Sequence, residues 1–136
     1  MDFMRSIFIA ATGLRAQSSR MRIISENIAN ASSTAQTPNA DPYRRRVPTF
    51  RTSFDRELQA TVVSMGNVRT DQSEFSVRNE PGHPAADAAG NVKYPNVNAL
   101  VETVDMREAQ RSYEANLNVI TATRRMIART IEILRA

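Results

Sequence analysis

The residue types that could support acid–base or metal chemistry in this sequence are few. His83 stands in a glycine- and proline-rich segment, residues 81–84, and the 136-residue chain has neither a second histidine nor a cysteine that could complete a metal-ligand set. The segment Asp87–Asn91 lacks the number and spacing of acidic ligands that a calcium loop requires. No nucleophile with a partner base and no glycine-rich phosphate loop is found. We therefore interpret both segments as turns and expect no cofactor, no bound metal and no enzyme activity.

Arg44-Arg45-Arg46 is the one run of three basic residues, and two interpretations of it remain open. It is either a solvated loop after a turn at Pro42-Tyr43, or a group that forms ion pairs with an acidic neighbouring subunit. Nucleic-acid binding is disfavoured by the distribution of charge. The net charge of +4 divides into +2 for residues 1–30, +1 for 31–96 and +1 for 97–136, whereas nucleic-acid-binding proteins present a concentrated basic surface.

The apolar residues that must position any site are concentrated at the two ends of the chain. Hydrophobic residues make up 41% of the sequence, and tryptophan is absent. Near the N-terminus, four of them recur every seven positions with a fifth beside them: Ile7, Leu14, Met21, Ile28 and Ile24. This spacing predicts a helix over about residues 4–29, roughly 40 Å long. Serines in the neighbouring row leave a narrow apolar face, which is typical of close helix packing.

The last forty residues show the same pattern more strongly. One row of residues seven apart consists of Met106, Tyr113, Ile120, Ile127 and Leu134, and a companion row consists of Gln110, Leu117, Arg124 and Ile131. Val119, Met126 and Ile133 widen the apolar face at one side. Because no proline or glycine follows Pro95, the pattern predicts one unbroken helix of about 36 residues, roughly 55 Å long.

These elements predict a mainly α fold. The long terminal helices, residues 1–31 and 97–136, would pair as a coiled-coil-like domain, and residues 32–96 would form a small, irregular, β-rich or loop-rich outer insert. Within the insert, Val47–Phe54, Leu58–Val63 and Phe75–Val77 are short candidate strands, separated by turn signals at residues 65–67 and 80–82. Partial disorder of this insert in the isolated protein is the alternative.

The helix pair carries more apolar surface than one partner helix covers. The surplus either remains exposed on an intramolecular hairpin or forms an interface between copies or relatives of the protein. Polar residues in the companion row favour the interface, because such positions set register and partner choice. No apolar run approaches the roughly 18–20 residues of a membrane span. The segment before Ser6 has no net side-chain charge and the hydrophobic pattern continues through Ile28 without a break, so we expect no cleaved signal peptide.

Two pairs of motifs resemble a known family. Gly13–Ser18 followed by Ile24–Asn30 is similar to the N-terminal signature of the flagellar rod and hook axial proteins. Tyr94–Asn98 followed by Glu108–Asn116 is similar to their C-terminal signature. The signature positions carried over to this chain are Ser25, Glu26, Asn27, Ala29, Asn30, Glu114, Ala115 and Asn116.

Further features favour a proximal-rod member of this family: the short chain, the segment Pro42–Arg46, and Gly82–Pro84 leading to Val92–Asn98. The sequence departs from the family pattern at two places. Ala85 stands where an acidic residue is more frequent, and Ala99 stands where proline often marks the first helical turn. The second helix could therefore begin anywhere from about residue 97 to 103.

The resemblance implies a structural subunit of the proximal rod of the bacterial flagellar basal body. Such a subunit would assemble helically through its terminal helices into the drive shaft that crosses the periplasm. It also implies export through the flagellar type III apparatus without cleavage. The implied partners are other copies of the chain, the rod proteins FlgB, FlgF and FlgG, and the base adaptor FliE, with no nucleic acid and no membrane insertion. The alternative is a soluble helical adaptor or an arginine-rich nucleic-acid-binding protein.

The predicted functional residues are therefore those of the helix seam through which copies assemble. They are Ile7, Leu14, Met21, Ile24, Ile28, Met106, Tyr113, Leu117, Ile120, Ile127, Ile131 and Leu134. Asn27, Asn30 and Asn116 are candidates for helix-end and interhelix hydrogen bonds, and asparagine tolerates the left-handed conformation common at helix ends. Tyr113 can place its ring in the seam and its hydroxyl at a polar edge. Glu26 and Glu114 could pair with arginines of adjacent subunits, and ordinary capping or solvation is the alternative for each.

Overall fold

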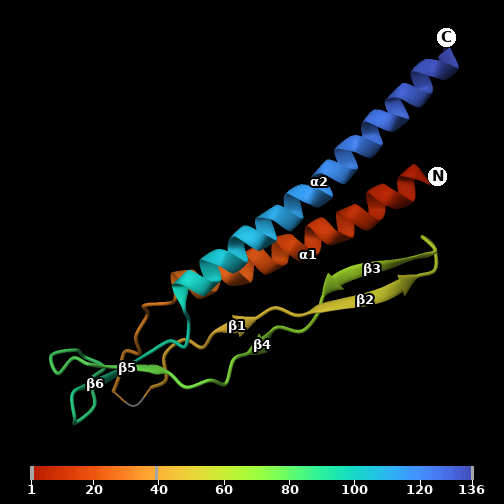
Figure 1. The fold of residues 1–136 in the computed structure, drawn as a ribbon. Helices are drawn as coiled ribbons and strands as arrows, with labels where there is room; N and C mark the ends of the chain where they lie inside the picture. The colour runs from red at the N-terminus through yellow and green to blue at the C-terminus, as the bar shows by residue number, and fades with distance from the viewer. Residues whose placement is uncertain (1, 39, 136) are drawn as a thin grey trace. The chain divides into compact units, whose positions relative to one another are not determined.

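A computed structural model describes residues 2–38 and 40–135 of the protein and contains two long helices there (Figure 1). Helix α1 spans Phe3–Ala29 and helix α2 spans Ala99–Arg135. Six short strands lie between them: β1 Arg46–Val47, β2 Phe50–Asp55, β3 Ala60–Met65, β4 Arg69–Thr70, β5 Ser76–Asn79 and β6 Asn91–Tyr94. Two helices with a small β-rich region between them confirm the coarse prediction of the fold.

Side-chain caps explain where both helices begin. The Asp2 carboxylate accepts a hydrogen bond from the backbone N–H of Arg5 at 3.2 Å, as an N-cap residue does. Asn98 does the same for α2, because its Oδ1 accepts from the N–H groups of Leu100 and Val101 at 3.0 and 3.4 Å. This cap fixes the helix start at Ala99 although the proline frequent in the family is missing there.

The strands form three separate antiparallel pairs, β1 with β4, β2 with β3, and β5 with β6. The β2–β3 hairpin is the longest, with Phe50 opposite Met65 and Asp55 opposite Ala60. Its turn lies after Asp55, whose carboxylate accepts the N–H groups of two following residues, and Gln59 has a left-handed φ of 48°.

The predicted strand limits were partly wrong. The run over residues 47–54 is divided at Pro48, because proline has no N–H to donate to a strand partner. Residues 66–67 are not in a turn and connect β3 to β4 without regular secondary structure. Gly66 is needed there because a Cβ would lie 2.6 Å from the Thr49 hydroxyl oxygen. The turn predicted at Pro81-Gly82 is confirmed.

The chain divides into two compact units that each combine segments from both helices and the middle. The first unit contains residues up to Met21, Thr49–Asn67 and the chain from Arg107 onward. The second unit contains Arg22–Pro48 and Val68–Met106. The prediction that residues 1–31 and 97–136 form one domain, and 32–96 an outer insert, stays a prediction. The two units each combine parts of both predicted domains, and residues 1, 39 and 136 lie outside the described residues.

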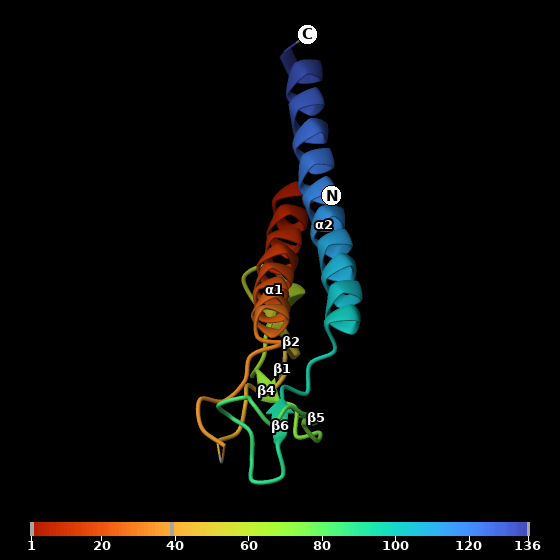
Figure 2. The same ribbon diagram turned by 90° about the vertical axis from the view of Figure 1, so that its left-hand side faces the viewer.

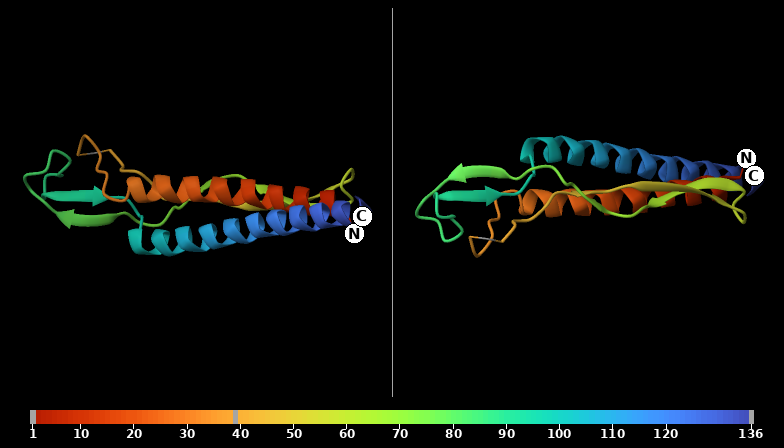
Figure 3. Two further views of the ribbon diagram at one scale, coloured as in Figure 1. Left: turned by 90° about the horizontal axis from the view of Figure 1, so that it is seen from above. Right: turned by 90° about the horizontal axis from the view of Figure 1, so that it is seen from below.

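The first unit is built from α1 up to Met21, α2 from Arg107 onward, and the β2–β3 hairpin. Figures 1 and 3 show the two helices running antiparallel and side by side within this unit. The hairpin packs on α1, since Ala16 and Ser19 line one hollow together with Val62–Met65. Its most buried side chains are small or polar: Ala10, Ala16, Ala109 and Thr123.

The second unit contains the largest fully buried side chains among the described residues. They are Glu102, Val92 and Asn27, and Ile23 and Ile24 are also buried in this unit. None of the helical segments in residues 2–38 and 40–135 combines the length and the apolar content needed to cross a bilayer.

Candidate assembly site

Asn27 is fully buried near the end of α1, and its side-chain amide connects three segments of the second unit. Nδ2 donates to the backbone oxygen of Arg46 at 2.8 Å and to Glu102 Oε2 at 2.9 Å. Oδ1 accepts from the Tyr43 hydroxyl at 2.8 Å and from the backbone N–H of Arg46 at 3.0 Å. Both donors and both lone pairs of the amide are therefore used, which permits its burial without an unpaired polar atom.

Glu102 is 1% exposed and is the acidic centre of the same region. Its second oxygen, Oε1, accepts a hydrogen bond from Nε of Arg45 at 2.6 Å. The Arg45 guanidinium also lies 3.8 Å from a carboxylate oxygen of Asp71 and 3.7 Å from one of Asp105. One guanidinium thus lies within ion-pair distance of three carboxylates, as its forked set of N–H donors allows.

The Asn96 side chain holds the loop before β1 and the loop after β4 together. Its Oδ1 accepts from the backbone N–H of Arg45 at 2.8 Å, and its Nδ2 donates to the backbone oxygen of Asp71 at 3.1 Å and to the hydroxyl of Ser73 at 2.9 Å. We call Asn27, Tyr43, Arg45, Asn96 and Glu102 the Asn27 cluster. It fixes the loop before β1 to the end of α1 and the start of α2 within the second unit.

Two pKa shifts belong to this region. Hydrogen bonds from the backbone N–H and the hydroxyl of Ser73 lower the pKa of Asp71, and the charges of Arg45 and Arg44 act in the same direction. Burial raises the pKa of the Tyr43 hydroxyl, which therefore stays a hydrogen-bond donor at neutral pH, although the charge of Arg46 opposes this shift. Both shifts preserve the protonation states in which the network is paired.

The three arginines of the run have partners within the chain, so the run is not simply a solvated loop, and ion pairing with a neighbouring subunit stays a prediction. Arg45 binds the carboxylates of its own chain, and Arg46 pairs with Glu26 at 2.6 Å. The guanidinium carbon of Arg44 lies 4.1 Å from the ring centre of Phe75, a cation–π contact. Glu26 thus has a partner within the chain, and pairing of Glu26 and Glu114 with arginines of a neighbouring subunit stays a prediction.

The asparagine predictions had mixed outcomes. Asn30 marks the helix end as expected, since its Nδ2 donates to the backbone oxygen of Glu26 at 2.8 Å. The predicted left-handed conformation is wrong for Asn27 and Asn30, because among the described residues a positive φ occurs at Gln59 and Gly90. Asn116 bonds within its own helix, with Nδ2 donating to the backbone oxygen of Ser112 at 2.9 Å.

Sequence reasoning missed Glu102, Arg45 and Asn96 as members of a site. A signal for Glu102 was present in the sequence, because it stands seven residues before Ala109, which begins the row Ala109, Asn116 and Thr123. That row faces inward, whereas the predicted companion row, Gln110, Leu117, Arg124 and Ile131, is exposed in this chain. Within the chain, close helix packing uses these small and polar residues, which large apolar spacing alone does not indicate.

The twelve predicted seam residues differ in burial. Ile24 is buried, and half-buried positions are Ile7, Leu14, Met21, Met106, Tyr113, Ile120 and Ile127. Ile28, Leu117, Ile131 and Leu134 are exposed. Whether the exposed positions contact neighbouring copies stays a prediction.

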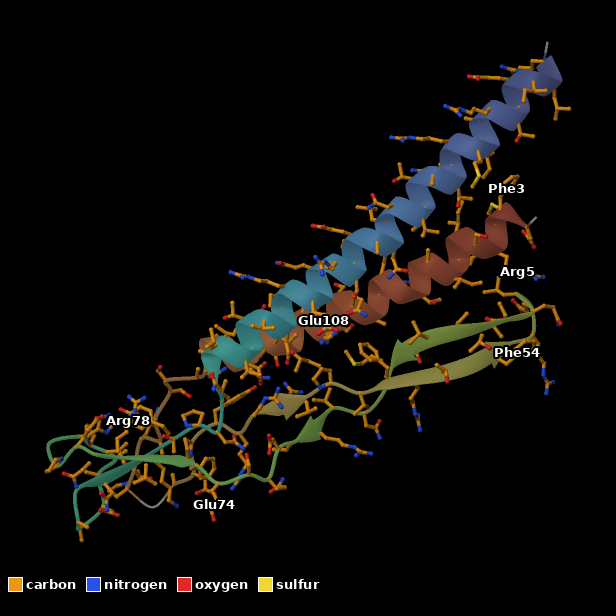
Figure 4. The ribbon with its side chains drawn as sticks, in the orientation of Figure 1. Phe3, Arg5, Phe54, Glu74, Arg78 and Glu108 are labelled. Atoms are coloured by element: carbon orange, nitrogen blue, oxygen red, sulfur yellow. The ribbon has the colours of Figure 1, made fainter. Side chains whose placement is uncertain are left out.

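Gly13 lets the two helices of the first unit approach closely. A Cβ at this position would lie 2.9 Å from both Nδ2 and Oδ1 of Asn116, closer than real contacts allow. Nearby, Arg20 pairs with Glu108 at 3.6 Å, and Figure 4 shows Glu108 on α2. The narrow face predicted from the sequence is therefore used for close packing.

Replacing Gly13 with leucine is expected to lower the free energy of unfolding by about 1–3 kcal/mol, because the helices of the first unit must separate to admit the side chain. The measurement is the urea midpoint at an unchanged slope. Gly82→Leu is the matched control, since nothing lies within 4 Å of a Cβ there, and its midpoint should not move. Equal losses from both variants would contradict the packing argument.

Large apolar side chains remain exposed along both helices of the first unit. They are Met4, Phe8, Ile9, Leu117, Val119, Met126, Ile131, Ile133 and Leu134. Phe50 and Phe54 of the hairpin are exposed as well, and Figure 4 shows Phe54 near the hairpin tip. Large exposed apolar surface of this kind, where it is contiguous, is typical of protein–protein contact sites.

The segments considered for chemistry form turns. His83 Nδ1 accepts the backbone N–H of Ala85 at 3.0 Å, and Asp87 accepts the N–H groups of Ala89 and Asn91 at 2.9 and 2.8 Å. Ala85, which follows this turn, is itself buried. Within residues 2–38 and 40–135, no group of three or more histidine, cysteine, aspartate or glutamate side chains is arranged to hold a metal ion.

Comparison with known proteins places this arrangement in a class. Residues 7–35 match the family model described as flagella basal body rod protein, and residues 88–133 match the model described as flagellar basal body rod FlgEFG protein C-terminal. The two matches cover the signature motifs at both ends. The helices and their exposed apolar faces are thus those of a flagellar basal-body rod protein.

The individual relatives show which family of rod proteins the chain belongs to. The flagellar basal-body rod protein FlgC of Agrobacterium fabrum is 52% identical over 94% of this chain and 92% of its own length. The FlgC proteins of Bacillus subtilis and Salmonella typhimurium are 34% and 35% identical over 98% and 92% of this chain, and over 99% and 92% of their own lengths. The chain belongs to the FlgC family of flagellar basal-body rod proteins. It is accordingly a structural rod component, and the adaptor and nucleic-acid alternatives find no support.

Proposed function

We propose that this protein is a subunit of the proximal part of the rod and assembles helically through its terminal helices. One observation carries the proposal: the exposed apolar side chains of the first unit lie in the first turns of α1, from Met4 to Ile9, and along the second half of α2, from Leu117 to Leu134. Burying such surface is the main favourable term in association. In a filament of copies, the exposed apolar surface of each copy would be covered by its neighbours.

The seam supports a coiled-coil-like pairing of the two helices. The half-buried row Met106, Tyr113, Ile120 and Ile127 alternates along α2 with Ala109, Asn116 and Thr123, which gives the three-and-four spacing of a heptad seam. Much of this seam is small or polar, so the isolated pair would be weakly stable. Packing against neighbours would complete it, and the free chain would be loose enough for export.

The expected partners follow from the same proposal. They are further copies of the chain, the rod proteins FlgB, FlgF and FlgG, the base adaptor FliE, and the flagellar type III export apparatus, which would deliver the chain without cleaving a signal peptide. The expected place of the protein is the periplasmic rod that forms the drive shaft. Family membership supports these partners as a group.

Replacing Ile127 with aspartate is expected to abolish rod assembly while export continues. Ile127 lines a hollow with Phe3 and Met4, and a carboxylate there would have no partner. Ile120→Asp should act in the same way. The measurements are swimming in soft agar, electron microscopy of basal bodies, and the amount of exported chain, in a strain without its own copy.

Asn118→Asp is the matched control because Asn118 is exposed on the same helix, and it should support motility fully. If Ile127→Asp cells build normal rods, the seam assignment is wrong. If cells without the chain build normal rods, the proposed function is wrong.

A further inference from the structure

The spacing of apolar residues permits more than one pairing of α1 with α2. Both helices carry their large seam residues at intervals of seven: Ile7, Leu14, Met21 and Ile28 in α1, and Met106, Tyr113, Ile120, Ile127 and Leu134 in α2. Seven residues make almost two full turns, so sliding one helix along the other by seven residues, roughly 10 Å, brings the same faces together again. Apolar spacing alone therefore does not decide between these two registers.

Two contacts define the register that the structure adopts, one in each unit. In the first unit, Asn116 of α2 lies so close to Gly13 of α1 that a Cβ at Gly13 would be 2.9 Å from its amide atoms. In the second unit, Glu102 of α2 accepts a hydrogen bond from Asn27 of α1 at 2.9 Å. Since α2 begins at Ala99, less than seven residues before Glu102, a slip in one direction would carry Asn27 beyond the helix. The slip in the other direction remains available.

The first unit can accommodate this second register. The slip places Thr123 against Gly13, where Asn116 now lies, and the threonine side chain is the shorter of the two. It also places Leu134 in the hollow at the start of α1, where Ile127 now lies. Leu134 is 81% exposed in the observed register, and Figure 2 shows α2 extending past the start of α1. Because α2 has 37 residues and α1 has 27, α1 stays covered along its length after the slip.

The second unit distinguishes the two registers. After the slip, Ala109 would stand opposite Asn27, and the Nδ2 of Asn27 would lose its acceptor on α2. Glu102 would move away from Arg45, whose Nε it binds at 2.6 Å. Of residues 99–104, Glu102 is the buried one, so its carboxylate is the main contact of the first turn of α2. Leaving such buried polar groups without partners is costly, which favours the observed register.

We propose that the Asn27 cluster sets the register of the two helices, holding α1 and α2 in the observed pairing against a second pairing shifted by seven residues. Asn27, Arg45 and Glu102 are thus positioning residues, which select between two arrangements that the apolar spacing permits. A single buried polar contact fixes the register of coiled coils in the same way. This role concerns pairing within one chain and does not depend on assembly into a rod.

The experiment measures the distance between two spin labels on the purified full chain by pulsed electron paramagnetic resonance. The labels are attached through Ser18→Cys and Arg129→Cys, at exposed positions of α1 and α2, and the chain has no cysteine of its own. Ser18 and Tyr113 line one hollow in the observed register, so the slip would bring Arg129 roughly 10 Å nearer to Ser18 along the helices. One distance is expected with the cluster intact. Glu102→Ala should add a second population at the shorter distance.

Moving the carboxylate by seven residues is the stronger test. The Tyr43 hydroxyl and the backbone of Arg46 bond to Asn27 itself, so this loop stays with α1 when α2 slips. In the double variant Glu102→Ala with Ala109→Glu, the new carboxylate meets Asn27 only in the shifted register. The shorter distance should therefore become the main population.

Val92→Ala is the matched control, because Val92 is fully buried in the second unit but is not a member of the Asn27 cluster. It should keep the single longer distance. A label pair within α2, Arg111→Cys with Arg129→Cys, should keep its distance in every variant, since the helix itself does not change. An unchanged distance between Ser18 and Arg129 in either Glu102 variant that folds overturns the inference. Loss of helical circular dichroism in both variants also overturns it, because two folded registers must exist. A second population in Val92→Ala would show that general stability, and not the cluster, sets the register.

Discussion

Replacing Asn27 with alanine is expected to lower the free energy of unfolding of the second unit by about 3 kcal/mol or more. The change removes four hydrogen bonds and leaves the Tyr43 hydroxyl, the backbone N–H and oxygen of Arg46, and one oxygen of Glu102 without a partner. Each unpaired buried polar group costs about 1–3 kcal/mol. Because a domain of this size is stable by only about 5–15 kcal/mol, the loss is a large share of the total.

Two measurements test the effect of the Asn27→Ala change on stability. Urea unfolding can be monitored by tyrosine emission, since the chain has three tyrosines and no tryptophan, and the midpoint should fall. Hydrogen exchange at the amide of Arg46 should accelerate, because this N–H donates to Asn27 itself. Asn118→Ala, at an exposed position of α2, is the matched control. Similar exchange of Arg46 in both variants would mean that Asn27 does not hold the loop.

Replacing Glu102 with leucine is expected to cost about 3–5 kcal/mol, the usual effect of removing one partner of a buried ion pair. Arg45 would keep Asp71 and Asp105, but at 3.8 and 3.7 Å these pairs are looser than the 2.6 Å bond that it loses. The amide of Asn27 would lose an acceptor as well. Urea unfolding measures the change.

The double variant Glu102→Leu with Arg45→Leu tests the pairing itself. Its loss should be smaller than the sum of the two single losses, because the single variants each leave a charge without its main partner. Additive losses would show that Glu102 and Arg45 act independently. Exposed Glu114→Leu is the control for a glutamate-to-leucine change on the same helix.

The helices were predictable because their signal is local. Spacing of seven between Ile7 and Ile28, and between Met106 and Leu134, repeats often enough to define both elements to within a few residues. The β-rich middle was predictable only in outline. Strands β1 and β4 have two residues each, too few for an alternating pattern, and the side chain of Asn96 holds their flanking loops together.

Apart from Glu102, which stands seven residues before Ala109, the members of the Asn27 cluster were not predictable from periodicity. Its members come from four separate segments, and each residue alone has an ordinary interpretation: a helix-end asparagine, a basic loop, a loop asparagine and a first-turn glutamate. The inward row of α2 was missed for a related reason, since Ala109 and Thr123 are small or polar. Gly13 is part of the signature motif. The reason for a glycine is given only by the structure, in which Asn116 of α2 lies directly against this position of α1.

The bond between Asn27 and Glu102 joins positions 75 residues apart, and this separation has a consequence during biosynthesis. A ribosome adds about 5–20 residues per second, so a nascent chain waits roughly 4–15 s between the two residues. Each unit also requires residues from the last third of the sequence. Until translation is nearly complete, the N-terminal segments have no surface to fold upon, and closing such a long loop carries an entropic cost. The polypeptide therefore leaves the ribosome as a flexible polymer rather than as a series of finished modules.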